Sequence, residues 1–395
     1  MTLPYGIFST DDSSPRVGVR LDNQILDLEM VGRLGFFDDL SFDLAVFKKP
    51  VLNDFMALGK PLCRTIRRRL IDLLNDPEKP LDAFADFVLI DAKATTLHLP
   101  IHIGDYTDFY ASEEHASNVG RMFRPQAEPL LPNWKHLPVA YHGRASSIVV
   151  SGTPIKRPKG PFLGLDQQPV FGPSNALDFE LELGIVIGKP STLGEPVSVN
   201  DAEDYVFGLV LFNDWSARDI QRWEYQPLGP FLGKNFASSM SPWVVPLEAL
   251  DSVRIDGPKQ EPTPLPYLQS GGRRHFDLTL EVALQTPDSP DEIVISQTNA
   301  RHLYWDVAQL IAHHTVNGCN LNVGDLLATG TISGSTPGSY GSLLELSWNG
   351  TRPLTLPDGS TRTFLQDGDT LILRGWANEK RIDFGEVRGK INAST

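Results

Sequence analysis

Two glutamates separated by one leucine, Glu180-Leu181-Glu182, stand inside a largely apolar run from Leu177 to Ile187. The run predicts a β-strand, in which alternate side chains share a face, so both carboxylates project to one side about 7 Å apart. Like charges placed this way repel each other, and burying them without a partner is costly. A divalent cation would remove both penalties, because carboxylates without cysteine or histidine favour Mg²⁺, Ca²⁺ or Mn²⁺ over zinc. A half-exposed strand with a solvated outer face is the alternative.

A second polar group follows the apolar strand Phe207–Phe212 and begins at Asp214. If the chain turns helical there, Asp214, Arg218, Gln221 and Tyr225 share one helix face. A carboxylate, a guanidinium, an amide and a phenol aligned in this way suit a metal beside a substrate that carries an oxyanion. A surface ion pair between Asp214 and Arg218, with a partly buried Tyr225, would explain the same spacing.

His115 differs from most of the nine histidines, which have ready structural explanations. It lies seven residues after Asp108, in a polar and aromatic stretch (105–115) without strong periodicity that predicts a loop. A loop histidine near a metal carboxylate is a natural general base, since its pKa lies close to neutral pH. A packing role is the alternative.

Two further features stand near the end of the chain. The turn Gly330–Ser335 could cradle a carboxylate with its backbone amides and hydroxyls, although a plain turn explains it equally. Glu345 lies within an apolar run, Leu343–Ser347, that reads as a strand. Such a charge usually faces solvent, and its other possible role is to orient a catalytic histidine.

The composition limits the classes of function. The net charge of −14 disfavours a nucleic-acid or anionic-membrane partner. Neither a GxGxxG fingerprint nor a GxSxG elbow is present, so we expect neither a nucleotide cofactor nor a serine nucleophile. Two cysteines without metal-ligand spacing, no apolar stretch of membrane-spanning length and no secretion signal predict a cytoplasmic protein.

The elements that must position these residues fall into two parts. A hairpin around Asp22-Asn23 and a helix within residues 57–75 are predicted first, followed by a connector over roughly 80–100. From about residue 101, short apolar strands alternate with Gly, Pro, Asn and Asp turns. Helices are expected only after Asp214 and near 300–314. We therefore predict a mostly β (α+β) protein with domains at 1–100 and 101–395.

Several long segments resemble the fumarylacetoacetase family in the same order along the chain. They are residues 105–115, 131–134, 141–147, 212–234 and 316–348, and they span most of 100–350. The resemblance implies a small SH3-like N-terminal barrel, then a large β-roll catalytic domain, and a homodimer.

The resemblance also implies roles for individual residues. It assigns a catalytic metal, Mg²⁺ or Ca²⁺, to Asp108, Glu180, Glu182 and Asp214; the general base to His115, held by Glu345; oxyanion stabilisation to Arg218, Gln221 and Lys234; and substrate contacts to Tyr110, Arg124, Tyr141, Gln221, Tyr225 and Thr331. A second, structural cation is expected near Asp214, Lys234 and Ser238, where a serine replaces the family's threonine.

The implied activity is hydrolysis of the carbon–carbon bond of 4-fumarylacetoacetate, a small anionic diketo acid, to fumarate and acetoacetate. This reaction is the last step of tyrosine and phenylalanine degradation. Acylpyruvate hydrolases and β-keto acid decarboxylases of the same superfamily are the alternative, but His115 and the Tyr110–Arg124 pocket argue against them. A catalytically silent scaffold protein would lack one of these positions, and all of them are present.

Overall fold

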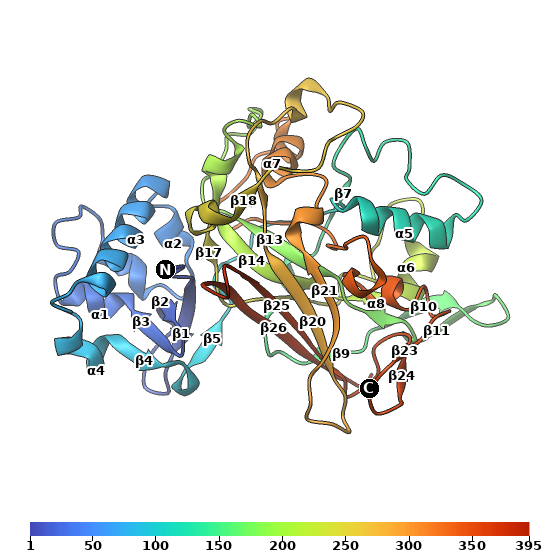
Figure 1. Ribbon diagram of the computed structural model, residues 1–395, viewed down its shortest axis with the longest axis horizontal. Coiled ribbons are helices and arrows are strands. Elements are labelled where there is room, and N and C mark those ends of the chain that lie inside the picture. The colour runs from blue at the N-terminus through green and yellow to red at the C-terminus, as the bar shows by residue number, and fades with distance from the viewer. Residues whose placement is uncertain (395) are drawn as a thin grey trace.

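The computed structural model describes residues 1–394 and is mostly β, with 29% strand and 24% helix, which confirms the predicted class. In Figure 1 the N-terminal part, in blue, lies beside a larger body formed by the rest of the chain. Among the described residues no helix combines the length and apolarity that crossing a bilayer requires.

The N-terminal part is an antiparallel five-stranded sheet of order β4-β3-β2-β1-β5 with helices around it. Its hairpin turns at Asp22, whose φ of 49° lies in the left-handed region that such turns use, as the sequence predicted. The predicted helix is α3, which buries Cys63, Ile66 and Leu70 on one face. The elements are β1 (Tyr5–Ser9), β2 (Arg16–Leu21), β3 (Gln24–Asp27), α1 (Leu28–Arg33), α2 (Asn53–Met56), α3 (Lys60–Asn75), α4 (Ala85–Val88), β4 (Leu89–Asp91) and β5 (Thr96–His98).

The larger body is built on an eight-stranded sheet of order β7-β6-β22-β13-β14-β16-β8, with β17 paired to β14. Its long central strands, β13 and β14, are antiparallel, whereas β6 runs parallel to β22. The members are β6 (Tyr106–Phe109), β7 (Ala140–His142), β8 (Ile148–Val150), β13 (Leu181–Ile187), β14 (Val206–Asp214), β16 (Ser238–Met240), β17 (Val245–Pro246) and β22 (Leu326–Ala328).

A second five-stranded sheet, of order β21-β20-β25-β26-β9, packs against the first. Its strands are β9 (Ile155–Lys156), β20 (Thr279–Gln285), β21 (Ile293–Asn299), β25 (Thr370–Ala377) and β26 (Ile382–Asn392). Short pairs complete the β-structure: β10 (Lys159–Leu163) with β11 (Pro169–Pro173), β12 (Leu177–Asp178) with β15 (Ser216–Ala217), β18 (Arg254–Ile255) with β19 (His275–Phe276), and β23 (Leu354–Thr355) with β24 (Thr361–Arg362). The helices are α5 (Glu113–Phe123), α6 (Arg218–Glu224), α7 (Val307–Thr315) and α8 (Leu343–Leu346).

Strands β13 and β14 are buried on both faces, which explains their nearly continuous apolar sequence. Leu183 and Ile185 enter the core between the two large sheets. Val186 and Phe212 enter a second core that also contains Tyr5 and Ile7 of the N-terminal sheet. One sheet therefore supports both hydrophobic cores, and the carboxylates at the ends of its strands are held by well-packed elements.

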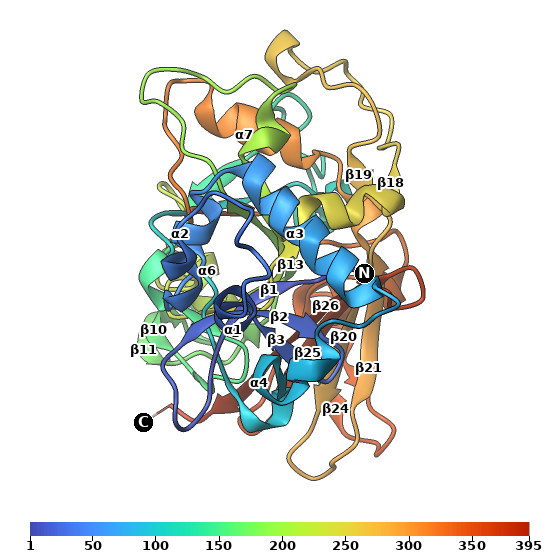
Figure 2. The ribbon, with the colours of Figure 1, turned by 90° about the vertical axis from the view of Figure 1, so that its left-hand side faces the viewer.

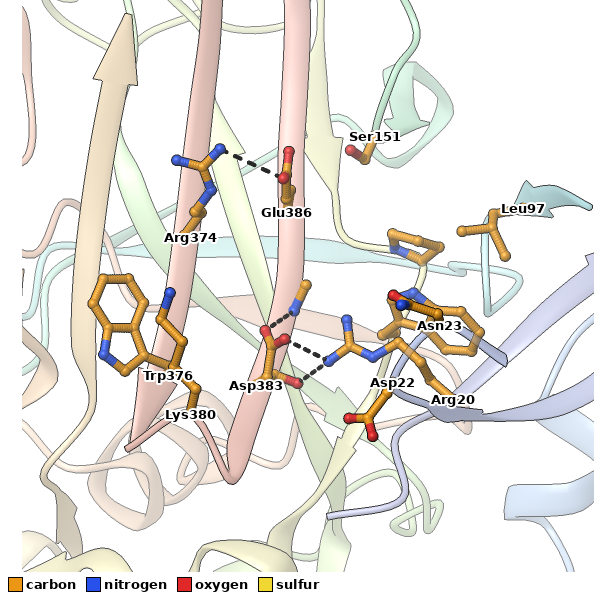
Figure 3. Close-up of a pocket in the computed structure, with 13 residues that line it drawn as sticks. Arg20, Asp22, Asn23, Leu97, Ser151, Arg374, Trp376, Lys380, Asp383 and Glu386 are labelled. Carbon is orange, nitrogen blue, oxygen red and sulfur yellow. Dashed lines mark hydrogen bonds and ion pairs between the residues drawn. The ribbon is translucent and has the colours of Figure 1, made fainter. Parts of the chain in front are cut away.

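Besides the shared core, polar contacts join the N-terminal sheet to the larger body. Tyr5 forms a backbone bridge with Val244. Figure 2 shows the molecule with the N-terminal part facing the viewer. Nearby, a cavity of about 470 Å³ opens between the β2–β3 hairpin and the hairpin of β25 and β26 (Figure 3). Across it, Arg20 Nη2 donates to the backbone carbonyl of Asp383 at 2.5 Å and lies 3.3 Å from its carboxylate. The charged groups of this cavity thus join the two parts of the chain.

Candidate active site

Four buried carboxylates converge where the central strands end. Asp108 comes from β6, Glu180 and Glu182 flank the start of β13, and Asp214 ends β14. Each contributes one oxygen to a group whose members all lie within 4.8 Å of one another. Glu182 and Asp214 share the sheet face of Val186 and Phe212, because alternate residues of a strand point the same way. The predicted convergence of these side chains is therefore present.

Two of these carboxylates have oxygens that nothing else satisfies. Asp108 Oδ1 and Glu182 Oε1 are buried and have no hydrogen-bond partner among the described residues. Burial and then the Asp214 carboxylate raise the pKa of Asp108 well above its usual range. Burial, followed by Asp108 and Glu180, does the same to the pKa of Glu182. Such orphaned oxygens fit a hard divalent cation, whose ligands are carboxylate oxygens.

The other two carboxylates are neutralised by cations of the protein. Lys234 Nζ donates to Glu180 and, at 2.6 Å, to Asp214. Arg218 Nη1 lies 2.8 Å from Glu180 Oε1. Although burial alone would raise the pKa of Glu180, the charges of Lys234 and then Arg218 outweigh it and lower that pKa. By contrast, neither Asp108 nor Glu182 forms an ion pair with a lysine or arginine in the described part of the chain.

His115 and Glu345 form a buried pair beside this group. His115 Nδ1 lies 2.7 Å from Glu345 Oε2, and its Nε2 lies 3.9 Å from Glu180 Oε1. A carboxylate only accepts hydrogen bonds when ionised, so the pair assigns the proton to Nδ1 and leaves Nε2 as a base. Burial alone would raise the pKa of Glu345, but His115 and the hydrogen bonds around the carboxylate lower it. The geometry matches the predicted base and its orienting carboxylate.

The residues assigned to oxyanion stabilisation surround Glu180. Arg218 donates through Nη1 to Gln221 Oε1 at 3.2 Å, and its Nη2 is buried with no partner among residues 1–394. That free N–H group is a donor available to a ligand. Lys234 Nζ, by contrast, is already engaged by Glu180 and Asp214.

Three of the predicted substrate contacts border the same group. Tyr141 donates to Asp108 Oδ2 at 3.0 Å or Asp214 Oδ2 at 2.6 Å. The Tyr110 ring meets the His115 ring edge-on, with 5.2 Å between centroids. Thr331 Oγ1 is buried, without a hydrogen-bond partner in the described part of the chain.

Of the other three substrate-contact positions, Gln221 is the partner of Arg218 described above, and the remaining two lie further out. Arg124 donates to the carbonyl of Pro129 at 2.8 Å. Tyr225 is 41% exposed, and its hydroxyl accepts a hydrogen bond from Gln226 at 3.2 Å. Neither makes a hydrogen bond to the carboxylate group in the described chain, so their substrate role stays a prediction.

The proposed second cation site is compact but already satisfied internally. Ser238 Oγ donates to Asp214 Oδ1 at 2.8 Å, and Lys234 Nζ donates to the other oxygen. Since its carboxylate neighbours raise the pKa of Lys234, the ammonium has no lone pair for a metal. This second cation site therefore remains a prediction.

Four local predictions were wrong in secondary structure. His115 lies on helix α5, not in a loop, because Ser112 caps the helix and Glu113 and Glu114 occupy its first turn. Glu345 lies on the short helix α8, not in a strand, because Ser342 accepts the hydrogen bond of its amide.

The other two concern the carboxylates of the central strands. The helix predicted after Asp214 is present as α6, but it begins only at Arg218, so Asp214 ends a strand outside it. Arg218 contacts Asp178 and Glu180 instead of Asp214. Glu180 lies in the break between β12 and β13, where its amide bonds the Asn213 side chain at 3.1 Å instead of a ladder partner.

Sequence reasoning missed the residues that fix Glu345. Asn118 donates to Oε1 at 3.0 Å, while Ser333 and Ser342 each donate to Oε2 at 2.8 Å. Ser342-Leu-Leu-Glu345 has the spacing of a capping box, a signal that could have revealed α8. The predicted turn at Gly330 has a further role, since its amide donates to Glu182 Oε2 at 3.1 Å. Gly330 has φ of 76°, and a Cβ there would lie 2.2 Å from the Phe109 carbonyl oxygen.

Comparisons with known proteins show the family of this chain. The family model "Fumarylacetoacetase N-terminal" matches residues 1–100, and "Fumarylacetoacetate (FAA) hydrolase C-terminal" matches residues 105–392. Fumarylacetoacetase from Homo sapiens is 49% identical over 396 residues, covering 98% of this chain and 94% of that protein. The Caenorhabditis elegans fumarylacetoacetase is 50% identical over 398 residues, covering 98% and 95%. The chain belongs to the fumarylacetoacetase family.

Solved structures share the fold at much lower identity. A fumarylacetoacetate hydrolase from psychrophilic Exiguobacterium antarcticum gives a TM-score of 0.57 at 17% identity, covering 99% of each chain. A 5-carboxymethyl-2-hydroxymuconate delta-isomerase from Mycobacterium smegmatis gives 0.53 at 15% identity, covering 99% of this chain and 100% of that one. Because both a hydrolase and an isomerase share this fold, the reaction of a fumarylacetoacetase family member must be argued from its site.

Proposed function

We propose that this enzyme hydrolyses 4-fumarylacetoacetate to fumarate and acetoacetate, with a divalent cation as cofactor. Near 49% identity over 98% of the chain to several fumarylacetoacetases supports the reaction. The observation that carries the mechanism is the buried His115–Glu345 pair, whose free Nε2 lies beside the carboxylate group. A base next to a metal site is what the hydrolysis of a β-diketone requires.

The residues present fit a divalent cation, because Asp108 and Glu182 each leave one buried oxygen without a hydrogen-bond partner among the described residues. Asp108, Glu180, Glu182 and Asp214 would hold it. When bound, a cation of this kind polarises the oxygens of a chelated diketone. We expect Mg²⁺ or Ca²⁺, since all four ligands are hard carboxylate oxygens.

The protein's own groups account for the proton movements. His115 Nε2 takes a proton from water while Glu345 holds the imidazole at Nδ1 and stabilises its positive charge. The hydroxide adds to the carbonyl carbon of the fumaryl group, and Arg218 Nη2 and Gln221 stabilise the resulting oxyanion. The carbon–carbon bond then breaks, its electron pair moves onto the acetoacetate carbon, and the imidazolium returns the proton to that carbon. Water is consumed, and fumarate and acetoacetate are the products.

The substrate is an anion in a protein of net charge −14, so local positive groups must attract it. We propose that Arg124 and Tyr110 hold its terminal carboxylate, with Tyr141, Tyr225 and Thr331 as further contacts. In support, burial raises the pKa of Tyr110, and the negative charges of Glu345 and Glu180 raise it further. The positive charges of Arg218 and Arg124 lower the same pKa. Tyr110 thus lies within the electrostatic reach of both the base and the arginines, and it stays a neutral donor.

The activity is tested by following the loss of diketone absorbance of 4-fumarylacetoacetate with purified protein. Turnover is expected, with fumarate and acetoacetate formed in equal amounts. Chelator is expected to abolish it, and added Mg²⁺ or Ca²⁺ to restore it. An acylpyruvate tested in parallel should react at least about 100-fold more slowly, because it lacks the carboxylate that Arg124 would bind. Faster cleavage of the acylpyruvate, or none of the fumarylacetoacetate, would exclude the proposal.

We also propose the larger organisation that the family suggests: domains at 1–100 and 101–395, a homodimer, and a cytoplasmic location. The separate N-terminal sheet and the meeting of the two family models near residue 100 support the division. Light scattering of the purified chain tests the dimer, and a monomer at micromolar concentration would contradict it.

A further inference from the structure

One buried carboxylate near the active site lies outside the metal-binding group and takes no part in the mechanism above. Asp178 ends β12 and is completely buried. Its two oxygens accept four hydrogen bonds, from the amides of Phe179, Leu343 and Leu344 and from the side chain of Arg218. These donors belong to separate parts of the site.

The first arm of this network reaches the oxyanion donor. Arg218 Nε donates to Asp178 Oδ2 at 2.8 Å, while Nη1 faces Glu180. Strand β12 also pairs with β15, directly before α6, and the Arg218 amide bonds the Ala176 carbonyl at 2.9 Å. Asp178 therefore fixes the guanidinium plane so that the partnerless Nη2 keeps one direction.

The second arm reaches the helix that carries Glu345. Leu343 and Leu344 are the first two residues of α8, and their amides have no partner within that helix. They donate to Asp178 at 2.7 and 3.0 Å. Since α8 has only four residues, these bonds determine where it begins and thus where Glu345 meets His115.

We propose that Asp178 is a positioning residue, which holds the oxyanion donor Arg218 and the Glu345–His115 pair at a fixed position relative to each other. It does not touch the substrate or the reacting atoms. The inference rests on the proposed hydrolysis, because it assigns Asp178 an effect on that turnover.

The chain offers a matched control in Asp27. This carboxylate is also buried, accepts from Arg16 Nε at 2.7 Å, and accepts from the amides of Glu29 and Met30 at the start of α1. It shares with Asp178 an arginine and two helix amides as partners, lacks a counterpart of the Phe179 amide, and lies in the N-terminal sheet. Any general cost of removing such a carboxylate is therefore common to both positions.

The experiment compares Asp178→Asn, Asp178→Glu and Asp27→Asn with the unmodified full-length enzyme. Both Asn variants are expected to fold and to lower Tm. Only the Asp178 variants are expected to lower kcat, by about 10- to 100-fold, as is typical for residues that orient groups at an active site. KM should stay within about threefold, since the loss falls on the transition state.

A double mutant separates positioning from general damage. Adding Asp178→Asn to Glu345→Gln should lower kcat by less than the product of the two single effects, because both act through one pair. Multiplicative effects, a kcat of Asp178→Asn within twofold of the unmodified enzyme, or failure of both Asp178 variants to fold would each overturn the inference. An unmodified enzyme that does not cleave 4-fumarylacetoacetate would instead overturn the proposed function.

Discussion

At the scale of single residues, the site divides its charges between two tasks. Asp108 and Glu182 each keep one oxygen without a donor among residues 1–394, so they are suited to a cation. His115 and Glu345 are satisfied by each other, so they are suited to proton transfer. This division implies that substitutions in the two groups affect different measurable quantities.

His115→Ala should therefore change mainly kcat, and Glu182→Gln should change mainly the affinity for the cation. His115→Ala removes the base and is expected to lower kcat by about 10²- to 10⁴-fold while leaving cation affinity within about twofold. Glu182→Gln removes a charged ligand and is expected to weaken cation affinity by about 10- to 100-fold. Titration calorimetry with Mg²⁺ or Ca²⁺ and steady-state kinetics measure the two quantities. Unchanged cation affinity in Glu182→Gln would show that Glu182 is not a ligand of the cation.

The pH dependence of stability is a second prediction for Asp108 and Glu182. Both pKa values are raised in the cation-free fold, so between the usual carboxyl pKa and the raised one the folded state binds more protons than the unfolded chain. Stability of the cation-free protein should therefore fall as pH rises through this interval. The lowered pKa values of Glu180 and Glu345 act only at acid pH, where their stabilisation is lost.

Calorimetric scans between about pH 5 and pH 8, with chelator and with saturating cation, measure this effect. Because a bound cation replaces the protons, the Tm difference between the two conditions should widen as pH rises. A difference that is independent of pH would show that the two carboxylates are already ionised in the cation-free fold.

At the scale of elements, sequence reasoning found β14 and α3 but missed α5, which begins in a stretch without strong periodicity, and the short helix α8. β14 and α3 carry patterns of nine and sixteen residues and were predicted. α8 has four residues, three of them leucine, so its sequence imitates a strand.

The candidate ligands could be named from residue type and spacing, together with the family resemblance. The hydrogen-bond partners that hold these residues could not be predicted, because they come from segments that only the tertiary structure brings together. Asn118 and Glu345, for example, are hydrogen-bonded although they lie 227 residues apart. The local sequence around either residue does not indicate such a distant partner.

The cap of α8 gives a prediction at this scale. Ser342 accepts from the Glu345 amide at 3.3 Å and donates to its carboxylate at 2.8 Å. Ser342→Ala should cost about 1 kcal/mol of stability through the lost cap and also lower kcat, because Glu345 loses part of its support. Asp306→Ala, which removes the cap of α7, is the control and should lower stability alone. Urea unfolding and kinetics decide this, and an equal loss of kcat in both variants would contradict it.

At the scale of the whole molecule, the N-terminal sheet and the active site depend on one shared core. Phe55 of α2 is fully buried, and its ring lies 5.0 Å from that of Tyr5 and 5.9 Å from that of Phe207, measured between centroids. Phe207 belongs to β14, the strand that ends at Asp214. Loss of packing in this core should therefore reach the strand that supplies a metal ligand.

Phe55→Ala should accordingly destabilise the chain as one unit, by about 3–5 kcal/mol for a fully buried phenylalanine. We expect a single calorimetric transition at lower Tm, with hydrolytic activity lost in that same transition. Phe87→Ala is the control, since Phe87 is 62% exposed and its removal should change stability by no more than about 0.5 kcal/mol. Two separate transitions, with activity following an unshifted second one, would show instead that residues 101–395 keep their site without the N-terminal sheet.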